Sequence, residues 1–285
     1  MAPALNPSRT LLEAPSSKAD LSVPESNPNV PPALDGIRYA TNFIAAVIAR
    51  VDFAPILSIA QTPVALFQED VRLILPEYGT NTITEIESTL SRVDGVPSLD
   101  NKRVDLVTHV FKSEAGDCSL TLCQKYLSVE CSRYTTYEDF KEIVTTAIDA
   151  LKRRYGSPTI QRLGLRYVNQ IRPGNGDPFD WKGLVDSTLT HFLDSVVDDK
   201  SKLARAITRA VYAEDDYSLA VTYGFFNREY PAKIASREFY LDFDCFTSES
   251  QPQEILPNFD RFHERIQELF EKCSGDGLRA IMNQQ

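Results

Sequence analysis

The short spacing between successive apolar segments most limits what this chain of 285 residues can fold into. Alternating apolar stretches cover Val104–Lys112, Cys118–Cys123 and Tyr126–Ser132, and only a few residues separate one stretch from the next. Antiparallel strands need only a tight hairpin between them, whereas parallel strands need a crossover connection that usually contains a helix. The spacing therefore predicts antiparallel sheets and argues against a parallel, doubly wound sheet.

Two helices with a continuous apolar stripe are expected between and after the strands. The first begins at a capping box, Thr135–Glu138, and has the apolar positions Phe140, Ile143, Val144, Ala147, Ile148 and Leu151. The second runs through Phe259–Phe270. A further helix is expected from Asp180, as its N-cap, to about Val197.

The order of elements is the same in both halves of the chain: strand, helix, several strands, helix. This order predicts an α+β fold of two similar halves, residues 36–156 and 157–285, each with an antiparallel sheet backed by helices. The repeat concerns the order of elements and not residue identity. We expect the two halves to be fused into one globular unit around a pseudo-twofold axis.

Residues 1–35 differ in composition from the rest of the chain. They hold seven of the 17 prolines and no aromatic residue. Such a segment buries too little apolar area to offset the entropy lost on ordering, so a disordered tail is expected. A tether or leader is the favoured role, and a partner-binding arm is the alternative.

Charge and cysteine content bound the partners and the compartment. Forty acidic residues against 30 lysines and arginines leave a net charge of −10, which argues against a generic binder of nucleic acids or anionic membranes. No apolar run is long enough to span a membrane, so no membrane partner is expected. The five cysteines, an odd number outside a short secreted scaffold, predict buried, reduced thiols and a cytoplasmic location.

The clearest candidate for a binding site is an arginine pair in a basic segment. No acidic residue lies between Asp149 and Asp177, and alternation places Arg162 and Arg166 on one face of a strand with Gly164 between them. Two guanidinium groups beside a glycine are suited to hold a phosphate or carboxylate, with Asn169 as a further contact. The alternative, which we favour, is that these arginines pair with acids on neighbouring strands.

Asp242 and Asp244 are the natural partners of those arginines. In Leu241-Asp-Phe-Asp244 the two carboxylates share one strand face. Such a pair is also suited to Mg²⁺, which prefers carboxylate oxygens, although the sequence provides no third ligand. Cross-strand pairing with arginine is therefore the preferred interpretation, and no cofactor is assigned.

Three separated segments together carry a resemblance to a known family. They are Gly164-Leu-Arg-Tyr-Val-Asn169, Tyr134-x-x-Tyr137-x-x-Phe140 and Leu241-Asp-Phe-Asp244. In this order the chain, over about residues 39–283, resembles a sporadically distributed prokaryotic family of uncharacterised proteins with Gly-Leu-Arg-Tyr-x-Asn and Leu-Asp-x-Asp strand motifs. The resemblance implies a bacterial, intracellular protein of the mobile or accessory gene pool, and it implies no activity, cofactor or catalytic residue.

Three functions follow from these features. No catalytic constellation stands out, since the three histidines are scattered and no nucleophile elbow is present, so a non-enzymatic binding or accessory protein ranks first. Its partner would be another protein or a small anionic ligand, and a homodimer is left open. The alternatives are a Mg-dependent enzyme acting on nucleotides or phosphates, and a DNA-binding saddle similar in element order to the TATA-binding protein.

Overall fold

Nine strands form the framework of the residues that the structure describes, which are 38–61, 64–93, 96–248 and 250–283 of a computed structural model. The strands are β1 (Ile44–Phe53), β2 (Glu77–Val93), β3 (Val96–Lys112), β4 (Cys118–Leu122), β5 (Tyr126–Cys131), β6 (Ile160–Ile171), β7 (Ala206–Ala213), β8 (Ser218–Phe225) and β9 (Phe239–Thr247). They form one sheet in the order β2-β3-β4-β5-β1-β6-β9-β8-β7, and every neighbouring pair is antiparallel. The predicted α+β class with antiparallel pairing is confirmed, and the predicted tail lies outside the described residues.

The N-terminal and C-terminal halves of the chain contribute separate blocks of strands to this sheet. Strands β1 to β5 occupy one side, strands β6 to β9 occupy the other, and the blocks meet where β1 pairs with β6. Gly36–Gln285 forms one compact unit. The equivalence of two halves stays a prediction.

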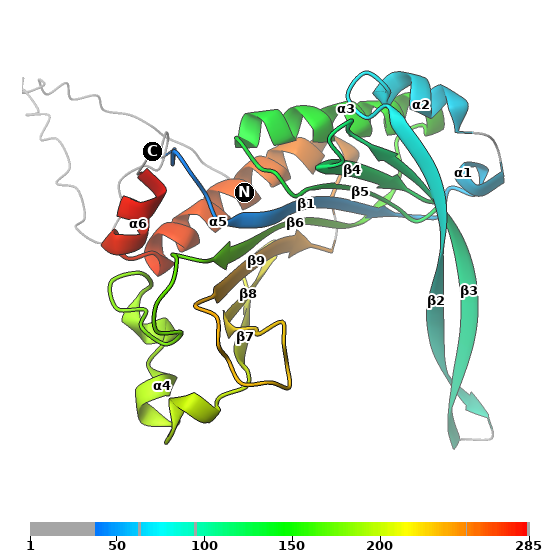
Figure 1. The fold of residues 1–285 in the computed structure, drawn as a ribbon. Coiled ribbons are helices and arrows are strands. Elements are labelled where there is room, and N and C mark those ends of the chain that lie inside the picture. Colours follow the sequence, from blue (N-terminus) through cyan, green and yellow to red (C-terminus); the bar gives the residue numbers. More distant parts are fainter. Residues whose placement is uncertain (1–37, 62–63, 94–95, 249, 284–285) are drawn as a thin grey trace, which may run out of the picture. The chain divides into compact units, whose positions relative to one another are not determined.

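The two long helices α3 and α5, together with α2, lie on one face of the sheet (Figure 1). The helices are α1 (Ser58–Gln61), α2 (Ala65–Val71), α3 (Tyr137–Tyr155), α4 (Phe192–Ser195), α5 (Ile255–Cys273) and α6 (Asp276–Asn283), with 3-10 turns at Ser187–Leu189, Lys200–Lys202 and Pro252–Glu254. The N-cap of α3 is Thr136, whose hydroxyl accepts from the backbone N–H of Asp139, one residue later than expected. None of the helices in the described part of the chain is long and apolar enough to cross a bilayer.

The prediction of a helix from Asp180 to about Val197 is wrong. The segment contains only a 3-10 turn and the four-residue α4. Gly183 adopts a positive φ of 74°, and its carbonyl accepts from the N–H of Gly277, while Val185 forms a β-bridge with Ser274. The backbone groups that a helix would use are thus partly taken by the corner between α5 and α6.

The core lies between the sheet and α3 and α5. In β1 the side chains of Val47, Ala49, Val51 and Phe53 are buried, while the alternate residues remain partly exposed on the other face. The same period of two in β6 and β9 buries one apolar face of each strand. We call the sheet face opposite α3 and α5 the open face.

The expectation that all five cysteines are reduced is wrong for two of them. Cys118 on β4 and Cys131 on β5 stand directly opposite each other in the ladder and form a disulfide. The hairpin register brings them together, and their separation of 13 residues in the sequence did not indicate it. Cys123, Cys245 and Cys273 are free and buried, as expected.

A group of tyrosines and a histidine, with Tyr167 buried and the others partly buried, joins the start of α3, β6 and α5. The hydroxyl of Tyr167 donates to that of Tyr134 over 3.3 Å and lies 3.1 Å from Nδ1 of His263. The ring of Tyr137 stacks on the His263 ring at 3.9 Å, and its hydroxyl donates to Asp260 over 2.9 Å. Two of the three segments that carry the family resemblance therefore meet in the core.

This cluster predicts a pH dependence of stability. Burial lowers the pKa of His263 to about 4, although Glu138 and Asp260 favour its charged form. Because the unfolded chain takes up a proton near pH 6.5 and the folded chain only near pH 4, the free energy of unfolding should fall by about 3 kcal/mol over this window as pH decreases. Urea unfolding of the wild type and of His263→Asn, measured from pH 7.5 to 4, tests this. An equal pH slope in both proteins would contradict the assignment.

The corner between α5 and α6 predicts a steric requirement for glycine. A Cβ on Gly275 would overlap the carbonyl oxygen of Gly183, which belongs to the backbone and cannot simply rotate away. We expect Gly275→Ala to lower the free energy of unfolding by about 1–3 kcal/mol. Gly79→Ala is the control, because a Cβ there meets no atom within 4 Å, and equal effects of the two substitutions in urea unfolding would contradict the prediction.

Candidate functional site

The candidate site is a row of charged side chains on the open face of the three strands at and beside the β1–β6 junction. It comprises Arg50 and Asp52 on β1, Arg162, Gly164 and Arg166 on β6, and Asp242 and Asp244 on β9. We call this set the charge row. The register places Asp52 opposite Arg162, Arg50 opposite Gly164, and Arg166 opposite Asp244.

Arg166 and Asp242 form the most complete pair of the charge row. The Nε and Nη2 groups of Arg166 donate to the two carboxylate oxygens of Asp242, each over 2.7 Å. This hydrogen bonding raises the pKa of Arg166. The side chain of Asp242 is only 9% exposed, whereas that of Arg166 is 43% exposed, so the arginine remains in contact with solvent. Bidentate pairing is strong and fixes the orientation of the guanidinium group.

Arg162 is held less firmly. Its Nη2 lies 3.3 Å from Asp244 and its Nη1 lies 4.0 Å from Asp52, so it bridges β9 and β1. The guanidinium also lies over the ring of Phe246 at 4.9 Å. Burial is the largest influence on Asp244 and raises the pKa of its carboxyl, against the effect of the two nearby arginines.

Gly164 provides the room that Arg162 occupies. A Cβ at this position would lie 2.8 Å from Nη1 of Arg162, so the guanidinium is packed against the bare backbone of the strand. The sequence suggested that this glycine admits a ligand. In the structure the space beside it holds an arginine of the same strand.

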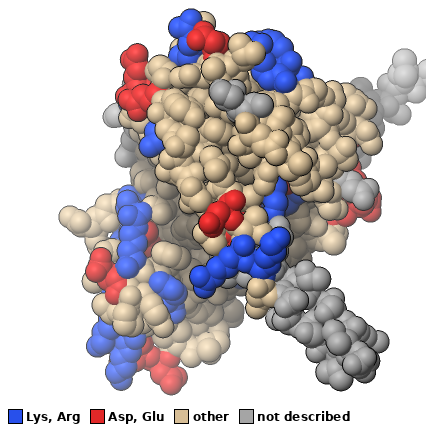
Figure 2. Space-filling view, turned by 90° about the vertical axis from the view of Figure 1, so that its right-hand side faces the viewer, with Lys and Arg blue, Asp and Glu red and all other residues tan. Residues whose placement is uncertain are grey.

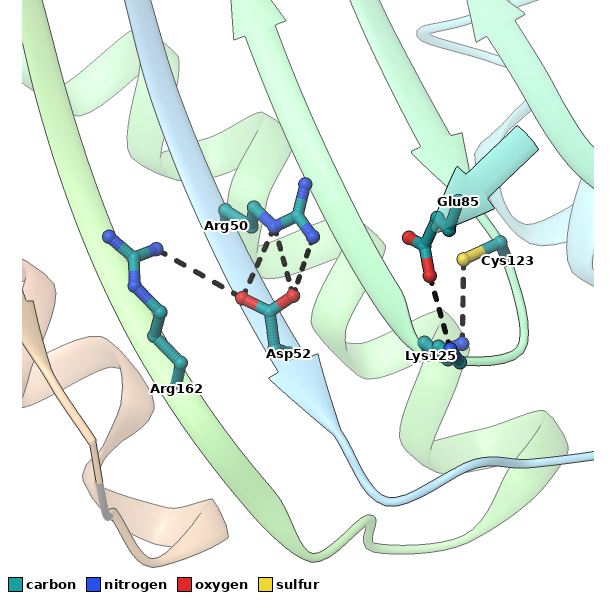
Figure 3. A network of polar contacts seen from close by, with 6 residues as sticks. All are labelled: Arg50, Asp52, Glu85, Cys123, Lys125 and Arg162. Carbon is teal, nitrogen blue, oxygen red and sulfur yellow. Dashed lines mark hydrogen bonds and ion pairs between the residues drawn. The ribbon is translucent and has the colours of Figure 1, made fainter. Parts of the chain in front are cut away.

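Arg50 and Asp52 extend the row onto β1 (Figure 3). Nε of Arg50 lies 3.0 and 3.1 Å from the two oxygens of Asp52, and Nη2 lies 2.6 Å from one of them. The Arg50 guanidinium stacks on the ring of Tyr126 at 3.8 Å. This pair is not among the residues predicted from the sequence, although the alternation Arg-x-Asp within a strand was an available signal.

A second ion pair lies beside the row, between β2 and the turn that joins β4 to β5. Nζ of Lys125 is 3.1 Å from Glu85, and the backbone N–H of Lys125 donates to the sulfur of Cys123 over 3.4 Å (Figure 3). This pair links β2 to the turn between β4 and β5. It fastens the middle of β2 to the central part of the sheet.

The charge row is electrically balanced. Three arginines and three aspartates give it no net charge. On the side of the molecule seen in Figure 2, acidic and basic side chains likewise lie next to one another, with wide uncharged areas between the groups. A phosphate on this row would therefore compete with aspartates for the arginines, whereas a surface with its own acids and bases would meet complementary groups.

Asn169 does not lie with the arginine pair. It is 4% exposed, and its side-chain amide donates to the carbonyl of Leu241 over 3.2 Å. The period of two along β6 separates it from Arg162 and Arg166, because an odd-numbered offset turns its side chain to the other face. The structure thus assigns it a contact between β6 and β9.

The structure brings Asp242 and Asp244 together with the arginines, as the preferred interpretation expected. Each carboxylate faces a guanidinium group. Among the described residues, no group of three His, Cys, Asp or Glu side chains is placed to hold a metal ion.

Comparison with known proteins adds no assignment: no family model matches the chain, and the search of curated proteins finds no match.

A double-mutant cycle tests the strength of the central pair. Asp242→Ala leaves the half-exposed Arg166 without its partner and should lower the free energy of unfolding by about 1–3 kcal/mol. The coupling energy with Arg166→Met should be about 1 kcal/mol or more, measured by urea unfolding. The exposed pair Arg38–Glu138 is the control and should couple by less than about 0.5 kcal/mol. Equal coupling in both cycles would contradict the special role of the pair.

Proposed function

We propose that this is a non-enzymatic binding protein that engages a partner protein through the open face of its sheet, centred on the charge row. The observation that carries the proposal is the placement of the row: fixed, paired charges lie on the open face of the sheet. Helices α3 and α5 cover the other face (Figure 1). Sites built on strands hold their side chains more precisely than sites on loops.

The composition of the face supports a protein partner. Tyr240 and Phe246 lie partly exposed on the same face as the arginines, while the buried ring of Tyr126 lies under Arg50. Arginine and aromatic residues dominate the energetic centres of protein interfaces. Each guanidinium has more N–H groups than its aspartate partner uses, so donors remain for a ligand. The balanced charge favours a partner surface that carries both signs. A small anionic ligand at Arg162, the loosest arginine of the row, is the alternative occupant.

The strand order supports the proposal that the two blocks of the sheet are structurally equivalent halves. Each block places its first strand at the centre, β1 or β6, and its last strand beside it, β5 or β9. In each block the last strand leads towards a long helix, α3 or α5. We propose that the charge row spans the axis between two related halves, in an intracellular bacterial protein of the accessory gene pool.

Site-specific photo-crosslinking in the native cells tests the proposed partner. A photoreactive side chain at Ser128, which stands opposite Arg50 in the sheet, should form a defined adduct with one protein, and the same probe at Glu142 on the exposed side of α3 should not. The double variant Arg50→Gln/Arg162→Gln should reduce the adduct at least about tenfold, since a desolvated charge pair contributes several kcal/mol to binding. Unchanged thermal unfolding of the variant shows that it is folded.

Three other results would overturn the proposal. An adduct that persists in the double variant would place binding elsewhere. A rise in melting temperature with a nucleotide and Mg²⁺, lost in Arg166→Ala and Asp244→Ala, would support a phosphate-handling enzyme. A shift of duplex DNA in a gel that weakens as salt increases would support the DNA-binding saddle.

A further inference from the structure

Strand β7 ends the sheet and leaves one edge uncovered. It is the last strand in the sheet order of the described residues, and it pairs only with β8. Its apolar side chains are unusually accessible: Ile207 is 39%, Val211 is 59% and Tyr212 is 53% exposed. An exposed edge strand with apolar side chains is a template on which another strand can pair.

The register of the β7–β8 hairpin shows which backbone groups are free. The N–H of Glu214 donates to the carbonyl of Tyr217 over 2.9 Å, and the register continues without a shift to the pair of Ala206 with Phe225. Hydrogen-bonded pairs alternate along an antiparallel ladder, so the even-numbered residues of β7 bond to β8. The odd-numbered residues, Ile207, Arg209, Val211 and Ala213, turn their N–H and C=O groups to the uncovered edge.

The usual protections of an edge strand are sparse here. Within β7 there is no proline, no bulge interrupts the register, and Arg209 is the single charged residue. Natural proteins commonly block such an edge with prolines, bulges or several charges. An eight-residue edge without them is suited to pairing.

Charge at the two ends of β7 indicates which strand would pair with it. Lys200, Lys202 and Arg205 precede the strand, and the acidic turn Glu214–Asp216 follows it. Arg205 stacks on Tyr230 at 4.2 Å and donates to backbone carbonyls, and neither Arg205 nor the exposed Asp215 forms an ion pair with another described residue. An antiparallel copy of the same segment would bring the acidic end of one strand to the basic end of the other at both ends.

We propose that two copies of this chain pair antiparallel through β7, so that their sheets become continuous across a twofold axis at Ala210. The odd-numbered residues must pair with one another, and the two such registers of greatest overlap have their axis at Arg209 or at Ala210. An axis at Arg209 would set two arginines directly opposite, which destabilises a strand pair. With the axis at Ala210, Arg209 lies opposite Val211 of the second copy, and Arg205 lies opposite its Asp215.

This dimer would extend the surface available for binding. A twofold axis perpendicular to the sheet keeps the open faces of both copies on the same side. The pairing uses the edge and not the charge row, so it stands or fails independently of the function proposed above.

Cysteine crosslinking tests the register. Across a non-hydrogen-bonded antiparallel pair the Cα atoms are about 4.5 Å apart, which a disulfide spans, so Ala210→Cys should crosslink to a dimer under mild oxidation. Thr208→Cys is the matched control, because it lies opposite Tyr212 of the second copy, and it should remain monomeric on a non-reducing gel. Preferential crosslinking of Arg209→Cys would overturn the proposed register.

Light scattering of the full chain without engineered cysteines tests the association itself. The wild type should have the mass of a dimer, and Val211→Pro, which removes an edge N–H that β8 does not use, should be a folded monomer. Val211→Thr keeps that N–H and should remain dimeric. Charge reversal at one end, Arg205→Glu, should weaken the dimer, and adding Asp215→Arg should restore it. A monomeric wild type, or a dimer unaffected by Val211→Pro, would overturn the proposal.

Discussion

The antiparallel pairing of β1 with β6 is the constraint on which the rest of the structure depends. These strands begin the two blocks of the chain, and each has further strands on its other side, so their ladder joins nine strands into one sheet. The ladder also sets the register of the charge row, because Asp52 stands opposite Arg162 and Arg50 stands opposite Gly164. A slip by one residue would turn these charges into the core.

Strand β6 connects two different environments because its side chains alternate between them. On the helix side, the buried Tyr167 contacts His263 and links α5 to α3 through the tyrosine cluster. On the open face, Arg166 binds Asp242 of the neighbouring β9. The segments that carry the family resemblance therefore contact one another on both faces of the sheet. The contact of Tyr167 with Tyr134 joins the two blocks, whereas the Arg166–Asp242 pair links neighbouring strands of the second block.

The binding surface and the assembly edge use different properties of the same sheet. The charge row lies on a face where every strand is already paired, so only side chains are available to a ligand. At β7 the backbone itself is available, and side chains mainly determine the direction and register of pairing.

The sequence by itself determined which side chains share a face and where the two long helices lie. A period of two groups Arg162 with Arg166 and Asp242 with Asp244, and a period of 3.6 defines α3 and α5, whatever the neighbouring elements are. These are local properties of the chain. The short connections between strands, which leave no room for a crossover helix, also predict that the strands pair antiparallel.

Only the tertiary structure decided which faces and edges meet. It placed β9 beside β6, so that the two predicted pairs of charges bind each other, and it added Arg50 and Asp52 from a strand more than 100 residues away from β6 in the sequence. It opposed Cys118 to Cys131, and it paired the largely polar β2 with β3 along its whole length, because a strand partner satisfies the backbone of polar and apolar residues alike. Contacts between distant segments depend on strand order and register, which local periodicity does not encode.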